Sequence, residues 1–278
     1  MKKILLTFDI EDWFQVENLK GKIKRSDWDY KKLRVKNNTN RILNLLEQYN
    51  QSATFFVLGW IAERIPETIE KIHAKGHEIA SHGYGHDLIY NLSKKEFRND
   101  VKKSKNILEA IIGENIYGYR APSFSITEWA IEILKKEGFL YDSSFFPTSF
   151  HDRYSKLKLY INKGHYIQKL YNDLYEIPIS TFEYFGKKFP IGGGGYFRIF
   201  PYFLYKKMFS FSIKQNHGGI FYLHPWEIDF NQPKIDKLKL GYKFRHYYGQ
   251  KTCLTKLEKL LKDFNFCSII NGIIKKKS

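Results

Sequence analysis

The chain has 278 residues, of which 43% are hydrophobic and 17% aromatic, so a sizeable core can form and an intrinsically disordered chain is excluded. Its 46 basic and 29 acidic residues give a formal charge of +17. The lysines are scattered and no nucleic-acid-binding motif is present, which favours a solvated, lysine-coated surface over a nucleic-acid partner.

The first half of the chain alternates short apolar runs with amphipathic stretches, as βα units do. Strands are predicted over residues 4–8, 53–58, 78–80 and 116–119. Helices are predicted over residues 40–49 with Thr39 as N-cap, 66–74 ending near Gly76, 93–112 with Ser93 as N-cap, and 127–137 ending at Gly138.

The pattern continues in the second half. Further strands are predicted over residues 139–141, 176–180 and 220–223, with helices over 201–213 and, as the last one, 255–264. Seven strands with intervening helices and no clean linker predict one barrel-like α/β domain over residues 1–278. The irregular stretches 143–175 and 229–250 are expected to form surface loops bordering a substrate groove.

Polar side chains follow four of the predicted strands directly. These four stretches are Asp9 to Asp12, Ser81 to His86, Tyr119 to Ser123, and His224 to Glu227. In a barrel of parallel strands, the carboxyl ends of the strands converge on one mouth. The sequence therefore predicts that acids, an arginine and three histidines share that mouth.

Each of these pieces has an ordinary structural explanation when taken alone. An HxxxH pair such as His82 and His86 is common, and the acidic trio could cap a helix. Arg120 could form a structural ion pair, and His224 could be a satisfied buried histidine. Together, however, two imidazoles and a carboxylate supply the three protein ligands that a catalytic zinc site needs.

The four stretches, in this order, resemble carbohydrate esterase family 4, the NodB-type polysaccharide deacetylases. The matching motifs are Thr7-Phe8-Asp9, His82 to His86, Arg120-Ala121-Pro122 and Leu223-His224-Pro225. The resemblance covers a motif core of about residues 4–228 and leaves 229–278 as a C-terminal helical extension. It implies an irregular (β/α)7 barrel with one divalent metal, zinc first, with Co²⁺ or another ion as the alternative.

Three further segments are similar to a bacterial subgroup encoded with exopolysaccharide or lipopolysaccharide biosynthesis genes. They are FDIEDWF from Phe8, YDSSFFP from Tyr141, and GGGGYFRIFP from Gly192. The glycine run lacks the sequence of a phosphate-binding loop. We interpret it as a tight bend that lets Tyr196, Phe197 and Arg198 approach the mouth.

The resemblance also implies a role for each motif residue. His82 and His86 would bind the metal, and Asp9 would be the general base, held by Arg120. The backbone N–H of Ser123 would stabilise the oxyanion, and His224 would protonate the departing amine.

Two assignments stay open. Ile10 follows Asp9, so the third ligand is either Glu11 or Asp12, and strand alternation favours Glu11 only slightly. The family's acidic partner of the last histidine has no certain counterpart. Asp142 is a candidate, although a role in bracing a turn suits it better.

Aromatic residues beside the motifs are candidates for stacking on a sugar ring. They are Trp13, Tyr84, Tyr196 and Trp226, with Phe124 filling the place of an aromatic residue that the family often has where Ser123 stands. About half of them are equally explained as core residues.

The function implied is hydrolysis of the N-acetyl or another acyl group of an amino sugar in a bacterial surface polysaccharide or its precursor. One alternative is an allantoinase-like amidase acting on a cyclic amide or ureide, whose members often lack one metal histidine. The other is a non-catalytic carbohydrate-binding relative. The presence of His82 and His86 disfavours the first, and intact Asp9 and His224 disfavour the second.

The cysteines and the apolar runs indicate in which cell compartment we expect the protein. Cys253 and Cys267 form no CxxC pair, which suits a reducing compartment. All apolar runs are shorter than the roughly 18 residues that span a bilayer. Asp9 interrupts the apolar start before a signal peptide is complete. We therefore expect a cytoplasmic protein without a transmembrane segment and leave peripheral membrane contact and oligomeric state open.

Overall fold

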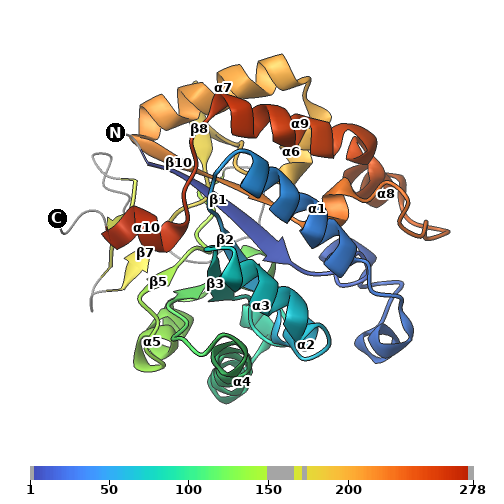
Figure 1. The fold of residues 1–278 in the computed structure, drawn as a ribbon, viewed down its shortest axis with the longest axis vertical. Helices are drawn as coiled ribbons and strands as arrows, with labels where there is room; N and C mark the ends of the chain where they lie inside the picture. The colour runs from blue at the N-terminus through green and yellow to red at the C-terminus, as the bar shows by residue number, and fades with distance from the viewer. Residues whose placement is uncertain (1–2, 149–165, 171–173, 275–278) are drawn as a thin grey trace.

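A curled sheet forms the centre of the computed structural model, which describes residues 3–148, 166–170 and 174–274 (Figure 1). Within these residues the sheet has eight strands in the order β10-β1-β2-β3-β4-β5-β7-β6. Every neighbouring pair is parallel except β6 and β7. The predicted α/β fold with seven parallel strands is confirmed, in the form of a half-barrel.

The predicted strands are all present, and most are short. Their bounds are β1 Lys3–Ile10, β2 Thr54–Val57, β3 Glu78–Ser81, β4 Gly118–Tyr119, β5 Tyr141–Asp142, β7 Tyr175–Glu176 and β10 Gly218–Leu223. The prediction did not include β6 (Gln168–Lys169) or the hairpin of β8 (Thr181–Tyr184) and β9 (Lys187–Pro190). Strands β2 and β10 are buried along their whole length, which explains why they read as continuous apolar runs.

Helices surround this sheet. They are α1 Val35–Gln48, α2 Gly59–Ala62, α3 Pro66–Ala74, α4 Lys94–Ile112, α5 Glu128–Lys136, α6 Gly194–Ile199, α7 Tyr202–Asn216, α8 Leu240–Tyr247, α9 Gln250–Asp263 and α10 Ile269–Ile274. The cap at Ser93 is confirmed, because its hydroxyl accepts a hydrogen bond from the Glu96 N–H and the Glu96 carboxylate accepts one from the Ser93 N–H.

The predicted cap at Thr39 is wrong. Helix α1 begins four residues earlier, and Thr39 is buried inside it. The carboxylate of Asp12, from a distant part of the chain, accepts the N–H groups of Arg34 and Val35 at 2.6 and 3.0 Å. A cap supplied by tertiary structure leaves no local sequence signal.

Two predictions for the C-terminal part are also corrected. Helix α9 is not the last, because α10 follows it, and the stretch 229–250 contains α8. Cys267 forms a parallel bridge to Leu5, and the N–H of Leu6 donates to the Cys267 carbonyl at 3.1 Å. These contacts fasten the C-terminal segment to β1. Of the predicted loop 143–175, residues 149–165 and 171–173 lie outside the described part of the chain.

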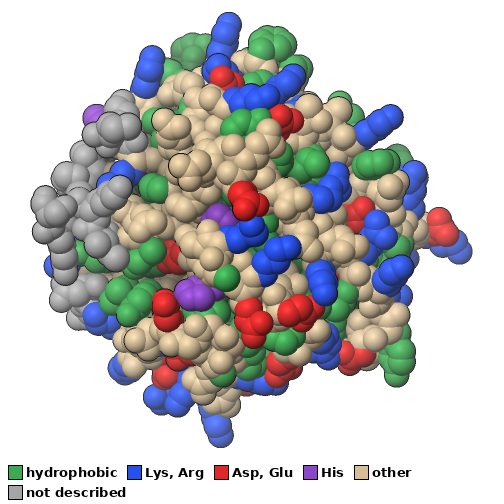
Figure 2. All heavy atoms as spheres, in the orientation of Figure 1, with side chains coloured by type: hydrophobic (Ala, Val, Ile, Leu, Met, Phe, Trp, Pro, Cys, Tyr) green, Lys and Arg blue, Asp and Glu red, His purple; other side chains and the backbone are tan. Residues whose placement is uncertain are grey.

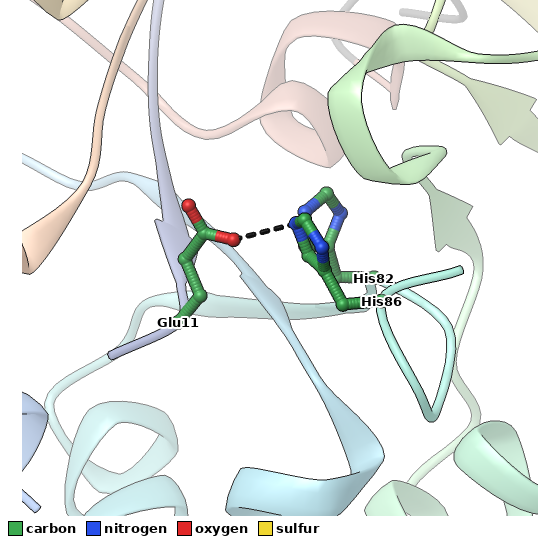
Figure 3. Close-up of side chains that lie close together, drawn as sticks. All are labelled: Glu11, His82 and His86. Atoms are coloured by element: carbon green, nitrogen blue, oxygen red, sulfur yellow. Dashed lines mark ion pairs between the residues drawn. The ribbon is translucent and has the colours of Figure 1, made fainter. Parts of the chain in front are cut away.

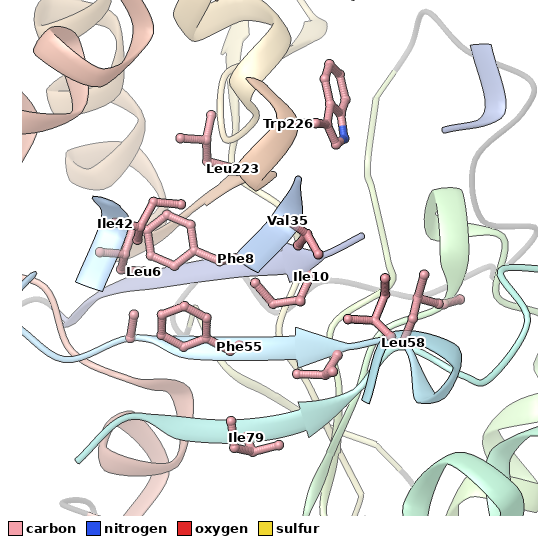
Figure 4. Close-up of a cluster of buried hydrophobic side chains, with 14 of the residues drawn as sticks. Leu6, Phe8, Ile10, Val35, Ile42, Phe55, Leu58, Ile79, Leu223 and Trp226 are labelled. Carbon is pink, nitrogen blue, oxygen red and sulfur yellow. The ribbon is translucent and has the colours of Figure 1, made fainter. Parts of the chain in front are cut away.

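The main core packs the first strand between its neighbours and α1 (Figure 4). Leu6, Phe8 and Ile10 of β1 are fully buried, as are Phe55 of β2 and Ile42 of α1. Burying side chains of this size contributes roughly 1.5–3 kcal/mol each. This packing holds the end of β1, and therefore the acidic residues that follow it, in a fixed place. Among the described helices, none has the length and apolar character to cross a membrane.

Candidate metal and catalytic site

The register of the sheet brings the predicted strand ends together. Phe8 pairs with Leu223, which puts Asp9 level with His224. Ser81 pairs with Tyr119, which puts His82 level with Arg120. A cavity of about 150 Å³ opens at this edge of the sheet. It is lined by Asp9, Glu11, Val16, Glu17, Asn18, His82, His86, Ser123, Phe124, Tyr222, His224 and Trp226.

Three buried side chains point toward one another in this cavity. One ligand atom from each of Glu11, His82 and His86 lies within 4.8 Å of the others, and Figure 3 shows the carboxylate facing both imidazoles. The Glu11 Oε2 and His86 Nε2 atoms are 2.7 Å apart. Among the described residues, no well-aligned hydrogen bond reaches this buried Glu11 oxygen.

His82 and Glu11 have the protonation states that metal ligands need, a neutral imidazole and an ionised carboxylate. His82 Nδ1 lies 2.8 Å from the Arg120 carbonyl, and since a carbonyl only accepts, Nδ1 carries the proton and Nε2 keeps its lone pair. Burial lowers the pKa of His82 to about 4, so the ring is neutral. Burial opposes ionisation of Glu11, but His86 and His224 outweigh it and lower its pKa to about 2. Two imidazoles and a carboxylate fit a first-row divalent ion such as zinc.

The two acids after Ile10 point in different directions. Asp12 caps α1 as described above, and its second oxygen accepts the Trp13 N–H at 2.8 Å. Glu11 faces the cavity and receives the Trp226 indole N–H at 3.1 Å. The geometry therefore favours Glu11 as the third donor and assigns Asp12 to the helix.

Asp9 is held by a buried arginine. The Arg120 guanidinium donates to Asp9 Oδ1 at 2.6 Å and, through the same nitrogen, to Thr7 Oγ1 at 2.9 Å. Its remaining N–H groups bind the carbonyl and hydroxyl of Ser143. Arg120 is fully buried, so its orientation is fixed. The other carboxylate oxygen of Asp9 lies 3.8 Å from His224 Nε2.

His224 has an acidic partner that the sequence analysis did not assign. Its Nδ1 lies 2.9 Å from Glu227 Oε2, and Glu227 Oε1 accepts the Arg198 Nε–H at 2.9 Å. Burial alone would lower the pKa of His224, but Glu11, Glu227 and Asp9 raise it to about 9. Glu227 stands three residues after His224 in a short turn, so their spacing is a signal that could have revealed the pair.

The glycine run leaves the space that the Glu227 side chain occupies. A Cβ atom on Gly194 would lie 2.1 Å from Glu227 Oε2, and one on Gly193 would lie 2.3 Å from the Tyr222 hydroxyl. Of the three residues expected to approach the mouth, Arg198 reaches it through Glu227, whereas the other two do not. Phe197 is buried in the core, and Tyr196 lies outside the cavity lining. The glycines therefore allow close packing against β10 and the turn after it.

Asp142, the other candidate partner, braces a turn instead. Its carboxylate accepts the Ser144 hydroxyl at 2.6 Å and the Ser144 N–H at 3.2 Å. The same hydroxyl receives the Ala121 N–H at 2.8 Å, which supports the segment that contains Arg120. Asp142 also lies in register with Glu176 on β7, and both carboxyl groups are fully buried.

The loop after β4 has an unusual backbone. Ser123 and Phe124 both have positive φ, at 51° and 55°, a conformation that costs a non-glycine residue about 1–3 kcal/mol and often marks functional sites. Among the described residues, no acceptor is recorded for the Ser123 N–H. Both residues line the cavity, so this N–H is available to a ligand there.

The aromatic candidates divide into two groups. Phe124 and Trp226 line the cavity, and Trp226 stacks on His224 with ring centroids 5.3 Å apart. Trp13 is buried against Phe14. Tyr84 donates to Glu63 and lies under Lys103, away from the lining. Lining residues that the sequence analysis missed are Val16, Glu17, Asn18 and Tyr222.

The Asp142–Glu176 pair leads to a prediction on stability. Burial and mutual repulsion raise the pKa of Glu176 well above its usual value, and burial raises that of Asp142 to about 6. Because the folded state binds protons at these carboxyl groups more tightly than the unfolded state does, protonation stabilises the fold. This contribution is fully present below about pH 4, near the usual pKa of a carboxyl group, and is lost as pH rises through the pKa of the folded state.

We expect Glu176→Gln to raise the free energy of unfolding at pH 8 by roughly 1–3 kcal/mol, with little change at pH 5. The glutamine can keep the hydrogen bonds without a charge. Urea unfolding at both pH values measures this, with Glu128→Gln on the surface of α5 as control. Equal effects of the two substitutions, or a loss at pH 8, would contradict the raised pKa of Glu176.

Comparison with known proteins gives two family matches, which together cover most of the chain. Residues 1–141 match the family model described as polysaccharide deacetylase, and residues 143–273 match a domain of unknown function, DUF3473. A peptidoglycan-N-acetylglucosamine deacetylase of Bacillus cereus is 37% identical over 98 residues, covering 34% of this chain and 36% of that protein. A peptidoglycan deacetylase of Helicobacter pylori is 29% identical over 153 residues, covering 51% of this chain and 52% of that protein. The chain thus spans about half or less of the length of these relatives.

Solved structures share the fold. A family 4 carbohydrate esterase from Streptomyces lividans, in complex with acetate, superposes with a TM-score of 0.52 at 13% identity, covering 96% of this chain and 91% of that one. A family 4 pseudoenzyme from Bacillus anthracis superposes with a TM-score of 0.53 at 14% identity, covering 97% and 64%. Since the fold accommodates both an enzyme and a pseudoenzyme, activity has to be argued from the site residues.

Proposed function

The chain belongs to the polysaccharide deacetylase family, and on that premise we propose that it hydrolyses the N-acetyl group of an amino sugar with the help of one divalent metal. The observation that carries the proposal is the cavity that Asp9, His224 and the Glu11–His82–His86 donor set share, in which His224 Nε2 lies 3.8 Å from Asp9 Oδ2 and 3.3 Å from Glu11 Oε1. A bacterial surface polysaccharide or its precursor is the proposed substrate, and the exopolysaccharide-type segments of the sequence support that setting.

The donor set would hold the metal, with zinc as our first choice because two histidines and a carboxylate are a common zinc ligand set. When bound, such an ion polarises an amide carbonyl and makes a water molecule acidic at neutral pH. Asp9, fixed through one oxygen by Arg120, accepts the proton of the attacking water at the other. The Ser123 N–H donates to the oxygen that becomes negative when the carbonyl is attacked.

His224 supplies the proton that the departing nitrogen needs. An amine anion is a very poor leaving group, so C–N cleavage requires an acid at that atom. Glu227 binds the Nδ1–H of the ring and keeps Nε2 directed into the cavity, while Arg198 fixes Glu227 from behind. Phe124 and Trp226 are the proposed sugar-contacting aromatics. The placement of Trp13, Tyr84 and Tyr196 away from the lining gives them structural roles instead.

We also propose that residues 1–278 work as one domain. The two family models divide the chain near residue 142, yet the strand pairing of β1 with β10 joins both parts in one sheet. The proposed base and metal ligands come from the first part, and His224, Glu227 and Arg198 come from the second. Neither part alone contains the complete site.

The direct test is mass spectrometry of N-acetylated sugars after incubation with the purified protein, with and without chelator. We expect the loss of one acetyl group per reacting sugar, which stops with chelator and resumes when zinc is added back. Loss of mass from a cyclic amide or ureide, but from no sugar, would favour the amidase alternative. Binding of sugar by metal-loaded protein without any mass change would favour a non-catalytic relative.

The role of Glu227 can be tested through the leaving group. We expect Glu227→Gln to lower kcat for an N-acetyl sugar about 10- to 100-fold, the usual effect of losing a partner that orients a site residue. An O-acetyl ester with a good leaving group needs little protonation, so its hydrolysis should fall much less. Glu258→Gln on the surface of α9 is the control. An equal loss for amide and ester would mean that Glu227 only maintains the structure.

A further inference from the structure

The outer face of α7 carries an exposed stripe of phenylalanine and lysine. A groove of about 540 Å³ runs along this face, lined by Phe203, Lys206, Lys207, Ser210, Phe211 and Lys214. Their spacing of three or four residues places them on one side of the helix. Phe203 is 67% exposed and Phe211 48% exposed. In Figure 2 hydrophobic and basic side chains alternate along the upper edge, where α7 lies.

The β8–β9 hairpin extends this surface. Its tip exposes Tyr184 by 57% and Phe185 by 88%. The hairpin is fastened to the second half of α7, because the Glu183 N–H donates to the Gln215 side chain at 2.7 Å and the Phe182 and Phe211 rings lie 6.4 Å apart. We refer to the groove residues of α7 together with this hairpin tip as the α7 face.

Charge on the α7 face is mainly positive. Lys187 and Lys188 follow the hairpin tip, and Lys206, Lys207 and Lys214 lie along the helix. Within the described part of the chain, Glu183 lies in the same hairpin, and Asp263 pairs with Lys206 at 2.6 Å. The face therefore combines several exposed aromatic rings with an excess of cations, in a chain whose formal charge is +17.

We propose that the α7 face binds the surface of a membrane that contains anionic lipid. Phenylalanine has no hydrogen-bonding group, so its exposed rings gain most by entering the boundary between headgroups and acyl chains. Lysines between such rings attract the anionic headgroups. A single sugar ring is too small to cover both Phe203, at the start of α7, and the hairpin tip beside its second half, whereas a membrane surface can cover both. The binding would hold the enzyme at a membrane and does not depend on the proposed deacetylation.

The test is co-sedimentation of the full chain with vesicles of phosphatidylcholine alone and of equal parts phosphatidylcholine and phosphatidylglycerol. We expect binding to the anionic vesicles that weakens as salt rises. The double variant Lys207→Glu/Lys214→Glu should bind at least about tenfold more weakly, and Phe203→Ser/Phe211→Ser should show a comparable loss that persists when salt is raised.

Matched controls come from elsewhere on the surface. Lys102→Glu on α4 changes an exposed lysine, and Phe244→Ser on α8 changes a ring that is 48% exposed like Phe211. Both should bind like the unmodified chain, and melting curves check that every variant is folded. The proposal is overturned by equal binding to neutral vesicles, by variants that bind as well as their controls, or by a soluble polyanion that binds the α7 face more tightly than the vesicles do.

Discussion

Replacement of Asp9 by asparagine is expected to lower deacetylation of an N-acetyl sugar by roughly 10²–10⁴-fold, the range of a lost general base. Asparagine keeps the shape and one acceptor oxygen but cannot take a proton from water at neutral pH. The measurement is the initial rate of acetate release from an N-acetylated oligosaccharide, together with metal content. The donor set does not include Asp9, so the variant should still bind metal.

The same substitution should also lower the free energy of unfolding. Arg120 is fully buried and its charge is balanced by Asp9 at 2.6 Å. Removing one partner of a buried ion pair costs about 3–5 kcal/mol because the remaining charge is left uncompensated. Rates must therefore be measured at a temperature where circular dichroism shows the variant to be folded.

Asp12→Asn is the matched control for Asp9→Asn. It changes a buried aspartate three residues away that caps α1 and does not line the cavity. We expect it to cost roughly 1 kcal/mol of stability and to change the rate no more than a few-fold. If Asp12→Asn abolished activity while Asp9→Asn kept it, the assignment of the two acids would be wrong.

Replacement of His82 or His86 by alanine is expected to remove the bound metal. The loss of a ligand should weaken metal affinity at least about 100-fold, more than the loss of an outer partner, and acetate release should fall to background. Elemental analysis after dialysis measures the metal directly. His77→Ala is the control, since His77 is a buried histidine outside the donor set.

Metal binding should also stabilise the fold. A ligand present at 100 times its dissociation constant adds about 2.7 kcal/mol to the free energy of unfolding. We expect added zinc to raise the melting temperature of the unmodified chain and of His77→Ala, and to leave that of His82→Ala unchanged. A similar rise in all three would place the zinc elsewhere on the protein.

Much of the site could be predicted before the structure, because its residues lie at or directly after the carboxyl ends of strands. Parallel strands end at one edge of a sheet, so Asp9 near the end of β1 and His82, Arg120 and His224 after β3, β4 and β10 could be expected to meet. The apolar pattern that marks a helix or strand is local, and so is the Ser93–Glu96 capping box. For this reason the seven parallel strands and the cap at Ser93 were predicted correctly, whereas β6, β8, β9 and several helices were missed.

The α/β class, the seven parallel strands and most residues of the candidate site could thus be read from the residue pattern. The direction of Glu11 and Asp12, the support of His224 by Glu227, and the choice of aromatic rings that line the mouth became visible in the folded chain. These choices depend on the direction of single side chains and on partners that come from other parts of the fold. Packing fixes both, and a linear pattern of residue types does not encode them.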